Sequence, residues 1–304
     1  MSIETDGKSE AIGLWSNNTL PGICKVNGEP IEEAVCFRCE YTENAAYLLD
    51  RLLFRNPEDR FEIPADAQTE LHRIIYYCIR TKDLYFPRLA HLADAFGRVQ
   101  EVSKVLSIGC GMAFQEAFLA GRFPQIQVLA TDFLETWKTY PFNNLTFSRK
   151  DILEWDEEGD YDFVFSIETL EHIEDYRRAF RNMAVKVKPG KYLYVSVPFA
   201  NKSEQQNEAL KKQELETYGH FLPGFSYEDL ETLFGENGFE VLHSSNMFDN
   251  FLVNILNRVL GKISGASIEV ALREFGELFL MDTRERRVDS RNTSVGIRML
   301  GKKL

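Results

Sequence analysis

Two glutamates and a histidine come together in the run Glu168-Thr169-Leu170-Glu171-His172, directly after the apolar stretch 161–167. That stretch predicts a strand buried on both faces, and open α/β sheets bind their ligands at the carboxyl ends of such strands. In a helical turn, Glu168, Glu171 and His172 stand at positions i, i+3 and i+4 and can face one point. Two carboxylates and an imidazole that converge in this way can bind magnesium, manganese, iron or zinc. The spacing therefore predicts a divalent-cation site.

A second pattern, Gly109-Cys110-Gly111, follows the apolar run 104–108 and passes directly into the helical stretch 114–120. Glycine lets the backbone turn sharply and lets a ligand approach the main chain closely, so the pattern predicts a strand, a tight turn and a helix that form a nucleotide site. A dinucleotide fingerprint would place its third small residue at Phe114, where a bulky ring obstructs helix-to-strand packing. The spacing therefore disfavours NAD.

The run 106–113, Leu-Ser-Ile-Gly-Cys-Gly-Met-Ala, resembles motif I of the class I S-adenosylmethionine (SAM) methyltransferases, with Ser107 in place of an acidic residue and Ala113 in place of a third glycine. The resemblance implies SAM as cofactor. Asp132 ends the apolar strand 126–132, where a carboxylate can accept hydrogen bonds from both ribose hydroxyls. Asp151, after the strand 145–147, resembles the acid that contacts the adenine amino group in this family. The cofactor-binding residues predicted in this way are Ser107, Gly109, Cys110, Gly111, Asp132, Phe133, Asp151, Ile152 and Ser166.

The Glu-x-x-Glu-His spacing resembles two groups of metal-dependent O-methyltransferases, the ubiquinone-pathway catechol enzymes and the small-RNA 3′-terminal 2′-O-methyltransferases. In the latter a further histidine after strand five completes the site, and His220 lies in that region. The resemblance implies Mg²⁺ or Mn²⁺ held by Glu168, Glu171, His172 and His220. Many metal-free class I enzymes also carry Leu-Glu-His here, where these side chains only line the cofactor pocket or cap the helix. Without a metal, His220 or His172 would act as the general base. The predicted catalytic residues are His220, His172 and Glu168.

The order of predicted elements resembles that of the class I methyltransferases, which implies an α/β fold with a doubly wound seven-stranded sheet, six strands parallel and the last one antiparallel. Residues 1–98 are expected to form a polar arm and a block of helices at about 42–54, 66–80 and 84–95, which would cap the mouth of the site. Residues 99–304 form the SAM-binding domain, with strands at 161–168, 192–198 and 237–242 and a helix at 226–234. A helix after strand four is expected to run to about residue 187, where Lys188-Pro189-Gly190 stops it. A helical insertion at about 249–293, whose end carries the cluster Arg284–Arg291, precedes the last strand at 294–300.

Composition limits the classes of partner. The formal net charge of −12 argues against nucleic acid, because binding to nucleic acid depends on Lys and Arg side chains that neutralise phosphates. No run approaches the roughly 18 apolar residues of a membrane span, and the amino terminus lacks signal-peptide features. Five cysteines make an odd set that fits reduced thiols. We therefore expect a cytoplasmic protein that does not bind membranes.

Together these features predict a SAM-dependent methyltransferase that methylates an oxygen of a small hydroxylated acceptor, such as a sugar or a secondary metabolite. One alternative is a 2′-O-methyltransferase of RNA 3′ ends, which the acidic charge disfavours. Another is a catalytically silent, methyltransferase-like binding or scaffold protein, which Ser107 and Ala113 keep open. The sequence does not indicate the oligomeric state.

Overall fold

The protein is built on one seven-stranded sheet. The computed structural model describes residues 37–54, 62–80, 85–247 and 296–304. The strand order is β3-β2-β1-β4-β5-β7-β6, and β7 is antiparallel to both of its neighbours while the other adjacent pairs are parallel. This arrangement confirms the predicted fold class. The strands are β1 (Lys104–Ile108), β2 (Gln127–Asp132), β3 (Leu145–Arg149), β4 (Tyr161–Ile167), β5 (Val187–Pro198), β6 (Phe239–Met247) and β7 (Gly296–Lys303).

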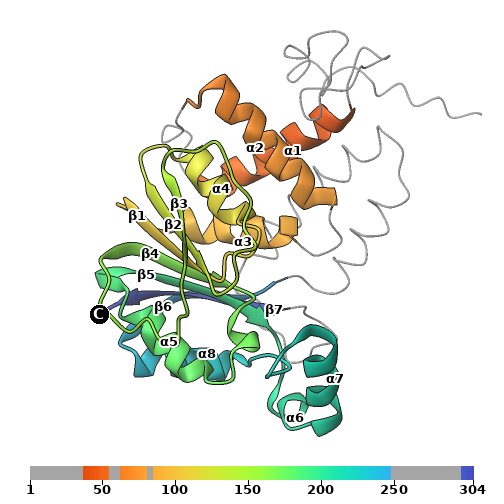
Figure 1. Ribbon diagram of the computed structural model, residues 1–304, viewed down its shortest axis with the longest axis vertical. Helices are drawn as coiled ribbons and strands as arrows, with labels where there is room; N and C mark the ends of the chain where they lie inside the picture. Colours follow the sequence, from red (N-terminus) through yellow and green to blue (C-terminus); the bar gives the residue numbers. More distant parts are fainter. Residues whose placement is uncertain (1–36, 55–61, 81–84, 248–295) are drawn as a thin grey trace, which may run out of the picture.

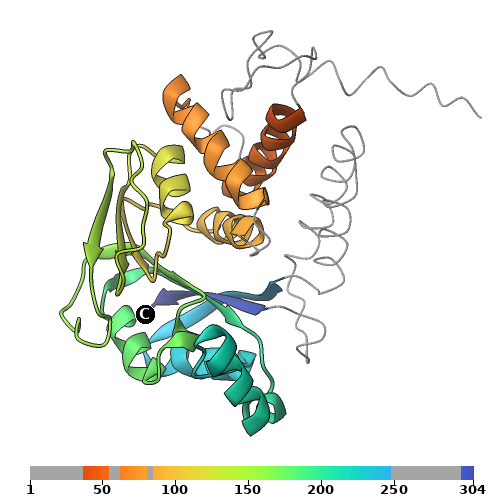
Figure 2. The same cartoon turned by 45° about the vertical axis from the view of Figure 1, so that its right-hand side comes forward.

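Helices cover both faces of the sheet (Figures 1 and 2). Successive side chains of a strand point to opposite faces, so Val105 and Phe163 pack into one hydrophobic core while Leu106 and Val164 pack into the other. The first core lies under α1 (Phe37–Leu53), α2 (Ala65–Arg80), α3 (Tyr85–Phe96) and α4 (Phe114–Arg122). The second lies under α5 (Tyr176–Ala184) and α8 (Tyr227–Glu236). Burial on both faces explains why the central strands are continuous apolar runs.

Several element boundaries differ from the prediction. Helix α1 begins at Phe37, five residues earlier than expected, and α5 ends at Ala184, three residues earlier. The expected stop at Lys188-Pro189-Gly190 instead lies inside β5, at an irregularity where Gly190 has φ 73° and the register with β4 shifts. The short helices α6 (Lys202–Gln205) and α7 (Glu208–Tyr218) were not predicted.

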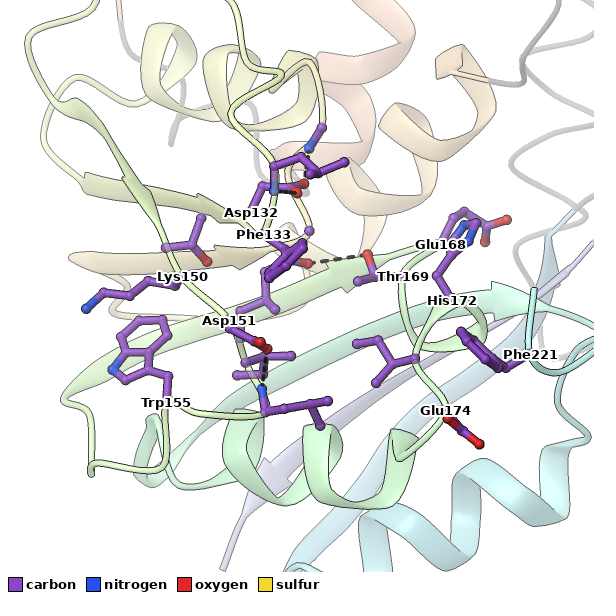
Figure 3. Close-up of a pocket in the computed structure, with 18 residues that line it drawn as sticks. Asp132, Phe133, Lys150, Asp151, Trp155, Glu168, Thr169, His172, Glu174 and Phe221 are labelled. Carbon is purple, nitrogen blue, oxygen red and sulfur yellow. Dashed lines mark hydrogen bonds between the residues drawn. The ribbon is translucent and has the colours of Figure 1, made fainter. Parts of the chain in front are cut away.

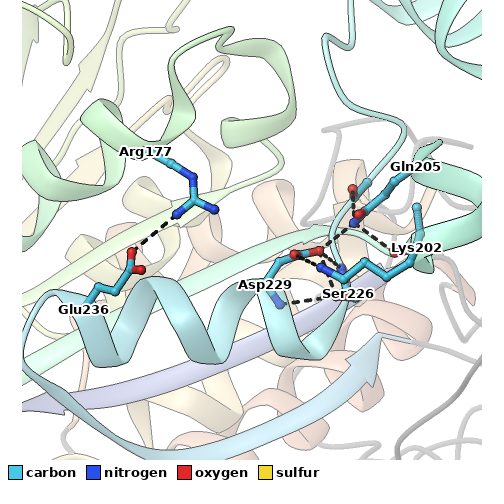
Figure 4. A network of polar contacts seen from close by, with 8 residues as sticks. Arg177, Lys202, Gln205, Ser226, Asp229 and Glu236 are labelled. Atoms are coloured by element: carbon cyan, nitrogen blue, oxygen red, sulfur yellow. Dashed lines mark hydrogen bonds and ion pairs between the residues drawn. The ribbon is translucent and has the colours of Figure 1, made fainter. Parts of the chain in front are cut away.

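A polar network fixes the segment after β5 to the start of α8 (Figure 4). Ser226 caps α8, and its hydroxyl and backbone N–H both donate to the Asp229 carboxylate, at 2.7 and 2.9 Å. The same carboxylate accepts from Gln205 (2.6 Å) and pairs with Lys202, both on α6. These bonds anchor α6, and with it the chain that continues through α7 to His220.

The amino-terminal helices are packed against the sheet domain. Helix α2 contacts α4, and α3 lies over the β5–β7–β6 part of the sheet, where the buried Arg298 of β7 pairs with Asp94 of α3 at 2.9 Å. Most of the predicted arm, the whole helical insertion and the Arg284–Arg291 cluster lie outside the described residues. None of the helices within the described ranges has the length and apolar character needed to cross a lipid bilayer.

Candidate functional site

A pocket of about 630 Å³ opens at the carboxyl ends of the parallel strands (Figure 3). The described residues that line it come from the loops after β1, β2, β3 and β4, with Phe221 from the segment after α7. Figure 3 shows Asp132 and Phe133 on one wall, Asp151 and Trp155 on another, and Glu168 and His172 on a third. The lining is mainly apolar with a few polar groups, as expected for a small-molecule site.

The glycine turn after β1 forms the floor of this pocket. Gly109 has φ 80°, and a Cβ there would lie 2.1 Å from Oγ1 of Thr169, so a larger residue would be strained and would collide. The backbone N–H of Gly111 donates to Oδ2 of Asp132 at 2.8 Å, while Oδ1 of Asp132 accepts from the N–H of Leu134 at 2.9 Å. Each carboxylate oxygen has a second lone pair, so Asp132 is held rigidly and can still accept hydrogen bonds from a ligand.

Six of the nine predicted cofactor residues line the pocket: Gly109, Gly111, Asp132, Phe133, Asp151 and Ile152. Ser107, Cys110 and Ser166 are buried and are not among the lining residues. Strand alternation explains Ser107, which shares its face with Val105 and points toward α4, where its hydroxyl donates to the Glu116 carboxylate. Ser166 lies inside β4, and its hydroxyl has no hydrogen-bond partner among the described residues.

Sequence reasoning missed other lining residues. Trp155 lies under the Lys150 ammonium, 5.1 Å from the ring centroid to Nζ, and both line the pocket beside Asp151. Thr169 and Phe221 also contribute. Trp155 could have been proposed from the sequence, because it lies only four residues after Asp151, the predicted adenine contact. Phe221 could not, because it reaches the pocket only through the way in which α6 and α7 fold back.

Glu168 does not share the helical turn that the sequence spacing suggested. The helix contains only Leu170–His172 and is a 3₁₀ turn, and Glu168 precedes it with φ 52°, a left-handed conformation that is uncommon for a non-glycine residue. Its carboxylate accepts from Ser196 Oγ and from Arg88 Nη2, both at 3.1 Å. The Glu168 carboxylate is therefore engaged by Ser196 and Arg88, and Glu168 is not in the group of described metal-type ligands that contains Glu171 and His172.

Glu171, His172 and His220 do converge. One ligand atom from each of these side chains lies within 4.8 Å of the others. The two imidazole rings meet edge to face with centroids 4.6 Å apart, and His172 Nε2 lies 4.0 Å from Glu171 Oε1. His220 reaches this position because the backbone N–H of Phe221 donates to the Glu171 carbonyl at 2.8 Å.

Both histidines are oriented by acceptors on their Nδ1 atoms. His220 Nδ1 is 2.8 Å from the buried carboxylate of Glu214, and His172 Nδ1 is 3.3 Å from the Gly219 carbonyl. An acceptor at Nδ1 puts the proton there and leaves the lone pair on Nε2, which is the usual arrangement of metal-binding histidines. Burial, reinforced by the charge of His220, lowers the pKa of His172, which favours its neutral form.

Glu171 is the buried member of the cluster. Its side chain is 1% exposed, and Oε2 has no hydrogen-bond partner among the described residues. Burial, and next the charge of Glu168, raises the pKa of the Glu171 carboxyl well above its usual value. An unpartnered buried carboxyl is unfavourable unless a cation or donor joins it. The three donors are of types that bind Mg²⁺, Mn²⁺, iron or Zn²⁺, so the cluster fits a divalent cation.

The sequence model of the family described as "Methyltransferase domain" matches residues 71–244, more than half of the chain. Two curated relatives match shorter parts. Trans-aconitate 2-methyltransferase of Deinococcus radiodurans is 34% identical over 100 residues, which are 32% of this chain and 38% of the relative. Malonyl-[acyl-carrier protein] O-methyltransferase 2 of Ilyobacter polytropus is 28% identical over 167 residues, 50% of this chain and 62% of the relative. The chain thus spans less than two thirds of either relative.

Solved structures share the fold. Phosphoethanolamine N-methyltransferase 2 of Haemonchus contortus, in complex with phosphomonomethylethanolamine and S-adenosylhomocysteine, superposes with a TM-score of 0.50 at 17% identity. The superposition covers 90% of this chain and 62% of that one. At this identity the likeness concerns the sheet and its helices rather than the acceptor.

Proposed function

The chain belongs to the methyltransferase-domain family of class I, SAM-dependent methyltransferases, and we propose that it methylates an oxygen of a small hydroxylated acceptor with the help of a divalent cation. The family and the fold support SAM as the methyl donor. The observation that carries the rest is the convergence of Glu171, His172 and His220 beside the pocket, with both Nδ1 atoms engaged.

The pocket supplies what a methyl donor with a nucleoside part needs. The glycine turn would leave space for the donor against the backbone, and Asp132 would accept hydrogen bonds from its ribose hydroxyls. Asp151 and Ile152 would lie along the adenine, with Trp155 behind them. SAM supplies an electrophilic methyl group on a sulfonium. The residues of the chain contribute by holding the acceptor oxygen in line with that methyl, which in favourable cases contributes about 7–11 kcal/mol.

Glu171, His172 and His220 would hold the cation, which would supply Lewis-acid chemistry that lowers the pKa of an acceptor hydroxyl. Glu214 and the Gly219 carbonyl keep the two imidazoles in the required tautomer. Without a cation, the same geometry leaves the Nε2 lone pair of His172 or His220 free to take the proton of the acceptor hydroxyl. The two versions differ in whether the cluster binds metal.

The test is a calorimetric titration of Mn²⁺ into the full chain saturated with S-adenosylhomocysteine. Wild type is expected to bind one equivalent saturably, and Glu171→Gln is expected to lose at least about tenfold in affinity, since it removes an anionic ligand. Glu174→Gln is the matched control, because Glu174 lines the same pocket but is exposed and lies outside the cluster. Absence of saturable binding in wild type, or equal binding by Glu171→Gln, would contradict the metal-assisted version and leave the histidine base.

A further inference from the structure

Arg88 belongs to the amino-terminal helices and lies next to the pocket wall that contains Glu168. It lies on α3, and its Nη2 donates to Oε2 of the pocket-lining Glu168 at 3.1 Å. The Arg88 side chain is 21% exposed and that of Glu168 is 12% exposed. Arg88 therefore places a partly buried positive charge beside the pocket wall that carries the Glu171 cluster.

The guanidinium of Arg88 is only partly satisfied. It carries five N–H donors, but it makes one hydrogen bond among the described residues, and its Nε is buried without a partner there. Its other contact is the ring of Tyr85, 5.9 Å from Cζ to the centroid. The Nε edge of this planar cation thus lacks an acceptor among the described residues.

Two other buried arginines are satisfied much more fully. Arg122 binds both carboxylate oxygens of Asp50, at 2.8 and 3.3 Å, and lies over the Phe54 ring. Arg298 bonds to Ser245, to the His91 carbonyl and to Asp94. The fold therefore provides bidentate or multiple partners for arginines that serve packing, and in the described part of the chain Arg88 has no such set.

Glu168 accepts one hydrogen bond from Arg88, and other contacts hold its carboxylate so that it does not accept a second one. Its Oε1 is occupied by Ser196 Oγ, its backbone N–H donates to the Ser196 carbonyl at 2.9 Å, and its φ of 52° limits its rotation. The free edge of Arg88 needs a further planar anion. Guanidinium groups match carboxylates bidentately, whereas a dianionic phosphate would be repelled by Glu168 and Glu171 at the same edge.

We propose that Arg88 binds a carboxylate of the methyl acceptor, so that the substrate is a hydroxylated carboxylic acid. The carboxylate pairs with the free edge of the Arg88 guanidinium, while the hydroxyl faces the Glu171, His172 and His220 cluster. This inference rests on the proposed function, because it concerns the acceptor of the same reaction. In this arrangement helix α3, which carries Arg88, contributes to the choice of the methyl acceptor.

The experiment compares two probes that differ by one carboxylate, 3,4-dihydroxybenzoate and catechol. Each is titrated by calorimetry into the full chain saturated with S-adenosylhomocysteine, at fixed Mn²⁺ concentration and ionic strength. Wild type is expected to bind 3,4-dihydroxybenzoate at least about tenfold more tightly than catechol, the effect of one charge-assisted pairing. Arg88→Gln is expected to lose that preference, and Arg88→Lys, which keeps the charge but not the planar fork, is expected to keep only part of it.

Arg177→Gln is the control, since Arg177 forms an exposed pair with Glu236 at 3.3 Å (Figure 4) and is not among the described residues that line the pocket. It is expected to keep the wild-type preference. Equal binding of the two probes by wild type, or a preference that survives in Arg88→Gln, would overturn the proposal. Titration of S-adenosylhomocysteine into each variant distinguishes a failure of the proposed function from a failure of the Arg88 proposal. A wild type that binds no S-adenosylhomocysteine contradicts the proposed function, whereas one that binds it without carboxylate preference contradicts only the role of Arg88.

Discussion

At the scale of single residues, motif I lacks its usual acidic residue, but the carboxyl of Glu116 lies beside the serine that stands at that position. Ser107 stands where the family pattern has an acidic residue, and its hydroxyl donates to the carboxyl of Glu116 on α4. Glu116 is 2% exposed, and its Oε2 has no partner among the described residues. Burial raises the pKa of Glu116 to about 7, against the opposing effect of the Ser107 hydrogen bond.

This pKa predicts a pH dependence of stability. Between the ordinary value of 4.5 and about 7, the unfolded chain releases the Glu116 proton while the folded protein keeps it. The free energy of unfolding therefore falls as pH rises through this window, by about 3 kcal/mol in total. Glu116→Gln still accepts the Ser107 hydrogen bond and has no proton to lose. It is expected to be more stable than wild type by about 2–3 kcal/mol at pH 8, and within about 1 kcal/mol at pH 5.

Urea unfolding at the two pH values checks this, with the exposed Glu174→Gln as control. The same difference between Glu116→Gln and wild type at pH 5 and pH 8 would show that Glu116 does not titrate in this range.

A second residue-scale prediction concerns Glu214, the buried carboxylate behind His220. Glu214→Gln removes the negative charge that holds Nδ1 of the His220 imidazole. The affinity for Mn²⁺ is expected to fall by about tenfold while the affinity for S-adenosylhomocysteine is unchanged. Calorimetric titration of both ligands measures this. Glu216→Gln, an exposed change on the same helix, is the control, and equal losses in the two variants would rule out a specific role for Glu214.

The sequence indicated part of this site. It identified Glu171, His172 and His220, because their residue types and order carry a pattern, and the structure brings them together. It also placed Glu168 in the same helical turn, whereas the structure has a three-residue 3₁₀ turn preceded by a left-handed residue, and Glu168 is not in the group of three described residues. Arg88, Glu116 and Glu214 carry no pattern. Only the folded chain brings Arg88 to Glu168, Glu116 to Ser107 and Glu214 to His220.

At the scale of elements, a buried polar network joins α3 to β6 and β7. Arg298 is 1% exposed, and it bonds to Asp94 on α3 and to Ser245 on β6, at 2.9 and 2.7 Å. Asp94 also accepts from Arg98 at 3.0 Å. Because Arg88 lies on the same helix, this network sets the position of Arg88 relative to the ends of the strands.

Asp94→Asn is expected to destabilise the protein by about 3 kcal/mol, because it leaves the Arg298 charge buried without a full counter-charge. Glu236→Gln, which breaks the exposed pair with Arg177, is expected to change stability by less than about 1 kcal/mol. Denaturant unfolding of both variants measures the difference. Similar small effects would mean that the network does not anchor α3.

Element prediction succeeded where local signals are strong. The strand Lys104–Ile108 and the helix that begins after the serine cap at Ser226 match the prediction closely, since apolar runs and caps are local features. The start of β5 was missed because Lys188-Pro189-Gly190 resembles a helix stop, whereas the sheet accommodates it as an irregularity beside β4. Helix α7 has few buried residues, so its polar sequence gave no periodic signal.

At the scale of the whole molecule, the seven-stranded sheet with an antiparallel last strand was predictable because the succession of strands and helices resembles that of class I methyltransferases, and the structure confirms it. How the amino-terminal helices pack was less predictable. They were expected to cap the mouth, and the structure shows α3 packed over the sheet, with Arg88 as a contact to the pocket wall. The fold brings three groups to one edge of the sheet: a nucleoside-sized pocket, a cation cluster and an arginine.

The central claim is that the pocket beside the glycine turn binds the SAM skeleton. Calorimetric titration of S-adenosylhomocysteine into the full chain tests it, with Asp132→Asn as the variant and the exposed Asp156→Asn as control. We expect one saturable site in wild type and in the control, and a loss of at least about tenfold in Asp132→Asn, whose side chain can no longer offer two anionic acceptors to the ribose. Failure of wild type to bind S-adenosylhomocysteine, or undiminished binding by Asp132→Asn, would contradict the account and favour a catalytically silent scaffold or a different pocket.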